Sequence, residues 1–69
     1  MIVFKKPTID TSWSVLWIEG DRPTLAGHIF VDFHVSFKPS GLILSEDELF
    51  TIASAMNYID NGKIPENTI

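Results

Sequence analysis

The sequence predicts an α+β fold in which a mainly antiparallel sheet of three or four strands is followed by one C-terminal helix packed on one face. Three observations lead to this prediction: an alternating apolar pattern at 29–38, a β-prone run at 12–19, and a capping motif before residues 46–60. With 69 residues the chain has room for a single hydrophobic core. We expect one domain over residues 1–62 and a peripheral C-terminal tail over residues 63–69.

The strands are predicted from side-chain alternation. Residues 29–38 carry an apolar side chain at every odd position, which is typical of a strand with one buried face. Residues 12–19 are apolar on both faces, as in a central strand, and the turn formers at 20–23 indicate a hairpin with a loose loop between these two runs. Residues 2–5 predict a short first strand, and residues 42–44 could add a fourth.

A helix is predicted over residues 46–60. Ser45 and Glu48 have the spacing of a capping box, and Gly62 provides a left-handed stop after the last turn. The residues expected to pack on the odd-numbered face of the long strand have the three- and four-residue spacing of one helix face: Leu49, Ile52, Ala53, Met56 and Ile59.

Composition excludes several classes of protein. At 45% hydrophobic and 20% charged residues, the chain is too apolar for intrinsic disorder. The absence of cysteine excludes disulfides and thiolate metal sites. No apolar run approaches the roughly 20 residues of a membrane span, and Met1–Lys6 reverses the order of a secretory signal, so we expect a cytoplasmic protein without membrane contact.

Charge is unevenly distributed along the chain. Residues 1–38 carry four basic and four acidic side chains, whereas residues 39–69 carry one basic and five acidic ones, so the net charge of -4 belongs to the helix and tail. The basic residues are scattered in sequence, which argues against nucleic acid as the partner. They are Lys5, Lys6, Arg22, Lys38 and Lys63.

The distribution of apolar residues predicts a protein-binding module. The helix has no charge from Leu49 to Ile59, and its outward side is expected to carry Phe50, Thr51, Ser54, Ala55 and Tyr58. One helix covers one face of a sheet, which leaves Phe30 and one side of residues 12–19 on the other face. A homodimer or a partner protein with a basic surface would cover these groups, unless loops and the tail fold over them. The predicted contact residues are Phe50, Ser54, Tyr58, Phe30, Trp13, Trp17, Glu46 and Asp47.

Catalysis is not expected. Asp32 and His34 are two positions apart on the predicted long strand, but no third ligand has the spacing to join them in a metal site. No nucleophile signature or phosphate loop is present, and we expect no cofactor. Small proteins of this kind commonly act as inhibitors or regulators of larger machines, including proteins carried by phages and mobile elements. The alternative is that His28 and Phe30, on the open face of the sheet, bind single-stranded nucleic acid or a small ligand.

Overall fold

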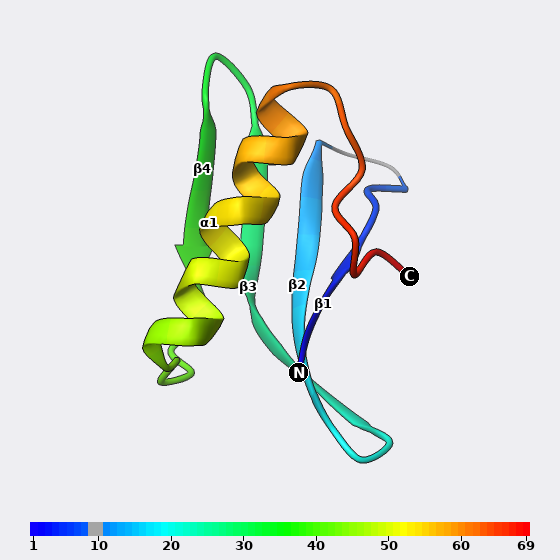
Figure 1. Cartoon of the computed structure of the whole chain (residues 1–69), viewed down its shortest axis with the longest axis vertical. Coiled ribbons are helices and arrows are strands. Elements are labelled where there is room, and N and C mark those ends of the chain that lie inside the picture. The colour runs from blue at the N-terminus through cyan, green and yellow to red at the C-terminus, as the bar shows by residue number, and fades with distance from the viewer. Residues whose placement is uncertain (9–10) are drawn as a thin grey trace.

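The computed structural model describes residues 1–8 and 11–69, which form a four-stranded antiparallel sheet followed by a helix (Figure 1). This confirms the predicted α+β class. Each strand pairs with the next along the chain, in the order β1-β2-β3-β4. The elements are β1 (Ile2–Lys5), β2 (Ser12–Glu19), β3 (Arg22–Val31), β4 (Val35–Pro39) and α1 (Glu46–Asp60).

The turn between β2 and β3 is tighter than the loose loop predicted from its composition. Glu19 pairs with Arg22, which leaves Gly20 and Asp21 as a two-residue turn. Gly20 has φ +65°, the left-handed region that a two-residue hairpin with glycine at its first position requires. Strand β3 therefore begins at Arg22, well before residue 29, where the alternating pattern suggested that it starts.

The predicted long strand over residues 29–38 is a hairpin. Strand β3 ends at Val31, β4 begins at Val35, and Ile29 pairs with Phe37 across them. The intervening residues turn around Phe33, whose side chain is fully exposed. Because this loop holds an odd number of residues, the alternation keeps its phase through the turn and odd-numbered residues stay on one face.

The helix begins and ends where the sequence predicts. The Ser45 hydroxyl accepts a hydrogen bond from the Glu48 N–H at 3.2 Å, and Glu48 Oε1 accepts one from the Ser45 N–H at 2.7 Å, which completes the capping box. Gly62 follows the helix with φ +73°. Residues 42–44 do not form the expected extra strand, since the fourth strand comes from the second half of the 29–38 pattern.

One face of the sheet packs against α1, and its buried residues include Phe4, Val15 and Ile29, each with at most 1% exposed surface. The inward side of α1 differs from the predicted stripe. Ala55 is buried, whereas Leu49 is 50% exposed and Ala53 is also exposed. At 100° per residue this is a rotation of roughly 45° from the predicted orientation. The inward stripe is Ile52, Ala55, Met56 and Ile59.

Residues 67–69, at the end of the predicted C-terminal tail, lie along the outer edge of β1. The Phe4 N–H donates to the Asn67 carbonyl at 2.9 Å and the Ile69 N–H donates to the Phe4 carbonyl at 2.8 Å, forming a parallel bridge. The Asn67 side-chain amide also donates to the Ile2 carbonyl at 3.2 Å, and Pro65 is buried. These residues satisfy backbone groups of β1 that no neighbouring strand reaches.

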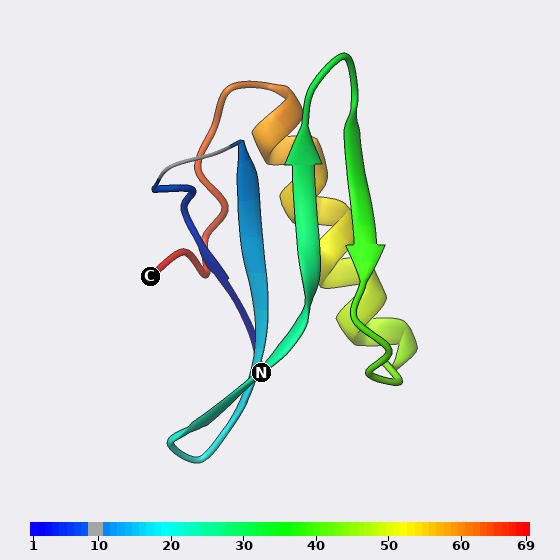
Figure 2. The same cartoon turned by 180° about the vertical axis from the view of Figure 1, so that it is seen from behind.

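The other face of the sheet has no helix over it, as the view from behind shows (Figure 2). We call this side the open face. Its side chains follow from the pairing register, because residues opposite those of the core point to the other side. They are Val3, Lys5, Ser12, Ser14, Leu16, Ile18, Pro23, Leu25, His28, Phe30, Ser36 and Lys38.

Candidate functional site

The outward side of α1 presents three predicted contact residues, Phe50, Ser54 and Tyr58, which we call the helix surface. Phe50 has 73% of its surface exposed and Tyr58 has 38%, and Ser54 between them is also exposed. They are spaced four residues apart, so they follow one slanting line along the helix. A phenylalanine this exposed is unusual on a helix that also has a buried side, and aromatic residues are enriched where proteins bind one another.

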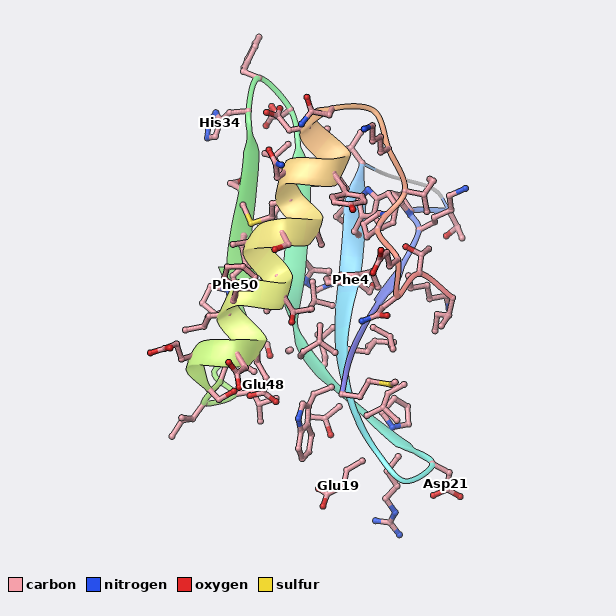
Figure 3. The ribbon with its side chains drawn as sticks, viewed as in Figure 1. Phe4, Glu19, Asp21, His34, Glu48 and Phe50 are labelled. Atoms are coloured by element: carbon pink, nitrogen blue, oxygen red, sulfur yellow. The ribbon has the colours of Figure 1, made fainter. Side chains whose placement is uncertain are left out.

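A groove of about 280 Å³ runs beside the helix surface, between α1 and the C-terminal segment. Ser54 and Tyr58 line it from the helix, and Pro65 and Asn67 line it from the segment. Phe4, on β1, also lines the groove and lies beside α1 on the side where that segment passes (Figures 1 and 3). The volume and mainly apolar walls of the groove suit one large apolar side chain from a partner.

Carboxylates surround this uncharged region. Glu46 and Asp47 are exposed in the first turn of α1, Asp60 is exposed in its last turn, and Glu66 lines the groove. Glu48 is part of the cap: the backbone hydrogen bond from Ser45 lowers its pKa below the ordinary value of 4.5, aided by hydrogen bonds from the side chains of Ser45 and Trp17. The helix surface is therefore uncharged, and carboxylates lie beyond both of its ends.

The two tryptophans are less available than the sequence suggested. Trp13 is 7% exposed and belongs to the core beneath α1. Trp17 is partly buried, packs against that core, and its side chain donates a hydrogen bond to Glu48. The prediction of both as contact residues is wrong for Trp13, because the odd-numbered face of β2 is the one that the helix covers.

Phe30 lies on the open face, as predicted, with 38% of its surface exposed. Its ring is 6.0 Å from that of His28, measured between centroids, at an interplanar angle of 41°. Ser12 and Ser36 are its partners on the two neighbouring strands. This end of the open face combines an aromatic pair with short hydroxyl side chains.

A row of polar side chains crosses the open face beside Phe30. Lys5 pairs with Ser14, Ser14 with His28, and His28 with Lys38, so the row spans all four strands. We call Lys5, Ser14, His28 and Lys38 the lysine row. It was missed in the sequence, where the lysines are far apart, because only the register of the hairpins places them in line.

Asp32 and His34 do not lie on a strand as predicted. Both are in the turn between β3 and β4, where the Asp32 N–H donates to the His34 carbonyl at 3.3 Å and the Asp32 carboxylate accepts the Phe33 N–H. Their carboxylate and imidazole are tied to a turn and not to a pocket. Within residues 1–8 and 11–69, no group of three or more histidine and acidic side chains has a geometry that could hold a metal ion.

In the described part of the chain, no helix is both long and apolar enough to cross a membrane, and α1 spans 15 residues. The chain matches no protein-family model, no curated protein and no solved structure.

Proposed function

We propose that this protein is a non-enzymatic binding module of the cytoplasm that docks on a larger protein through the helix surface and the groove beside it. The observation that carries the proposal is Phe50, which is 73% exposed near the start of the charge-free stretch of α1 from Leu49 to Ile59. Leaving an aromatic ring in water forgoes about 2 kcal/mol or more of burial energy, which contact with a partner would recover.

The partner that fits this surface has an apolar anchor side chain flanked by lysine or arginine. The anchor would enter the groove between Tyr58 and Pro65, and the basic groups would face Glu46, Asp47 and Glu66. Charge complementarity of this kind raises the rate of association and disfavours partners of the wrong sign. Binding would act by occlusion, as in a regulatory or inhibitory protein.

Self-association through the same surface is the second prediction. A homodimer would bury both copies of Phe50, but it would also bring two sets of first-turn carboxylates, Glu46 and Asp47, toward each other. Like charges at an interface oppose association, so a different protein with a basic surface is the better match. Mass measured by light scattering at low and high salt separates a dimer from a monomer.

The test uses capture from the native cell with four immobilised proteins. We expect the natural chain to retain a partner, Phe50→Glu and Tyr58→Glu each to lose it, and Phe33→Glu to keep it. Phe33 is the matched control because it is a phenylalanine outside the helix surface that is even more exposed than Phe50. A central contact residue contributes about 2 kcal/mol or more, which is a reduction in affinity of roughly 30-fold.

Equal recovery of the same partner by Phe50→Glu, Tyr58→Glu and Phe33→Glu would contradict this function. Thermal unfolding of each variant checks that the fold is intact. Because all three side chains are exposed, their melting temperatures should stay within a few degrees of that of the natural chain.

A further inference from the structure

The open face carries a charge opposite to that of the whole chain. The net charge is -4, yet among the described strand positions on this face the charged side chains are Lys5 and Lys38, and none is a carboxylate. Among the described residues, Glu19 and Asp21 lie at the end of the β2–β3 hairpin (Figure 3), and Asp32 is in the β3–β4 turn. Within residues 1–8 and 11–69, the strand positions of the open face are therefore positive, although the chain as a whole is negative.

A hollow of about 240 Å³ opens at the β1 end of the lysine row. Its walls hold two ammonium groups, from Lys5 and Lys6, together with hydroxyl groups and one imidazole, and its exposed lining is mostly polar. Ammonium groups donate only, whereas hydroxyl and imidazole groups can also donate, so the hollow is built to receive an acceptor-rich anion. The residues around it are Lys5, Lys6, Pro7, Thr8, Ser12, Ser14 and His28.

The length of the row indicates more than one anionic group. Lys5 and Lys38 are on opposite edge strands of the four-stranded sheet, so their backbones are about 14 Å apart at roughly 4.8 Å per strand. This spacing leaves room for two or more phosphates, one at each end of the row. A chain of phosphates could contact Lys5 and Lys6 at one end and Lys38 at the other.

Aromatic rings lie next to this positive row. His28 is in the row itself, and its ring is 6.0 Å from that of the partly exposed Phe30. Flat exposed rings beside lysines provide both contacts that an unpaired nucleotide makes, with stacking on its base and attraction for its phosphate. A duplex, whose bases stack on each other, would leave Phe30 without a contact.

We propose that the open face binds single-stranded nucleic acid, with phosphates at Lys5, Lys6 and Lys38 and a base stacked on Phe30. This site is on the side of the sheet away from α1, where no helix covers it (Figure 2). It is therefore distinct from the helix surface, and one copy of the chain can occupy both sites together. The protein would connect a partner protein on one side to a nucleic-acid strand on the other.

The test is fluorescence anisotropy of a short labelled single strand of mixed sequence, titrated with the full chain at several salt concentrations. Three phosphate contacts predict that log K falls with log salt at a slope of about -2, from roughly -0.7 per phosphate on a single strand. Phe30→Ala should weaken binding roughly 5- to 100-fold, as expected for loss of one stacked base.

Lysine variants distinguish phosphate contacts at a defined site from a nonspecific attraction between positive charge and the strand. Lys5→Gln combined with Lys38→Gln should reduce the slope to about -0.7, because two phosphate contacts are removed. Lys63→Gln is the matched control: it removes the same charge from an exposed position outside the lysine row and should leave affinity and slope nearly unchanged. Circular dichroism confirms that each variant is folded.

Three results would overturn the proposal. They are absence of any anisotropy change at low salt, an equal effect of all the lysine variants including Lys63→Gln, and unchanged affinity in Phe30→Ala. Competition identifies the ligand further. Unlabelled single strand should displace the probe at far lower concentration than a duplex of the same sequence or inorganic phosphate, and equal displacement by inorganic phosphate would show a plain anion site instead.

Discussion

The two faces of the sheet are made by the same strands and have opposite chemistry. On β2, Trp13 and Val15 are buried beneath α1, whereas Ser12 and Ser14, one position away from them, lie on the open face. The buried centre of the covered face is apolar, and the open face combines apolar side chains with the lysine row. Average composition can therefore mislead: a chain of net charge -4 presents a positive surface because alternation assigns neighbouring residues to different sides.

The largest effect should come from placing a charge on the covered face. Val15 has 0% exposed surface, so Val15→Asp would bury an unpaired carboxylate at a cost of several kcal/mol. That is comparable to the whole stability of a chain this size, roughly 4–10 kcal/mol. We expect Val15→Asp to lose its far-ultraviolet circular dichroism signal at 25 °C and the cooperative melt that the natural chain shows.

Ser14→Asp is the matched control on the open face. Its new carboxylate would lie between Lys5 and His28, its cross-strand neighbours, and should change the free energy of unfolding by no more than about 1 kcal/mol. If Ser14→Asp unfolded the protein as Val15→Asp does, the two faces would not differ as described. Ser14→Asp should also weaken single-strand binding, since one carboxylate offsets one of the two lysine charges in the row.

A smaller effect is expected at Gly27, where β3 and β4 lie close together. A Cβ atom on Gly27 would be 2.5 Å from the Lys38 carbonyl oxygen and 2.6 Å from the Phe37 ring, so Gly27→Ala must move β4 or its core side chain. Overpacking of this kind costs about 1–3 kcal/mol, which chemical denaturation would measure. Gly20→Ala, with no atom within 4 Å of its Cβ but φ +65°, should cost only about 1 kcal/mol. A loss from Gly27→Ala no larger than that from Gly20→Ala would contradict the close contact of β3 and β4.

The smallest effect is expected at the capping box where α1 begins. Ser45→Ala removes the hydroxyl that accepts the Glu48 N–H and should destabilise the protein by about 1 kcal/mol. Because the Glu48 pKa is lowered in the folded state, its contribution to stability is present above pH 4.5 and is lost as the pH falls through the lowered value.

Denaturation at pH 7 and at pH 3 checks this dependence. Glu48→Gln should lose less stability between these two values than the natural chain does. Asp47→Asn is the matched control, because it also removes one first-turn carboxylate but leaves both hydrogen bonds of the capping box in place. An equal response of the two variants would assign the pH dependence to the helix dipole in general and not to the cap.

Local patterns in the sequence predicted the elements well where each pattern is compatible with a single structure. The capping box at Ser45 and Glu48 placed the helix, and β1 and β2 follow their apolar runs. The 29–38 pattern has two meanings. A strand and a hairpin with a loop of odd length give the same alternation, so the turn at Phe33 could not be recognised from the period alone.

Features that depend on contacts far apart in sequence could not be predicted. Ala53 and Ala55 are the same residue type, but Ala53 was expected in the packed stripe and Ala55 on the outward side. The helix orientation that buries Ala55 depends on packing beside Phe4 and the C-terminal segment. The groove needs Pro65 and the lysine row needs the register of three strand pairs. Of the candidate site, the exposed aromatics Phe50, Tyr58 and Phe30 were predictable, while their surroundings were not.

The pairing of β1 with residues 67–69 sets an order on folding during synthesis. Strand β1 is synthesised before the C-terminal segment, and the Phe4 N–H finds its partner, the Asn67 carbonyl, only after more than sixty further residues have been added. Until then the outer edge of β1 is an unpaired template next to an apolar core, a situation in which nascent chains pair with one another. Expression at lower temperature or with slower initiation should therefore raise the soluble yield more than any substitution on the finished surface.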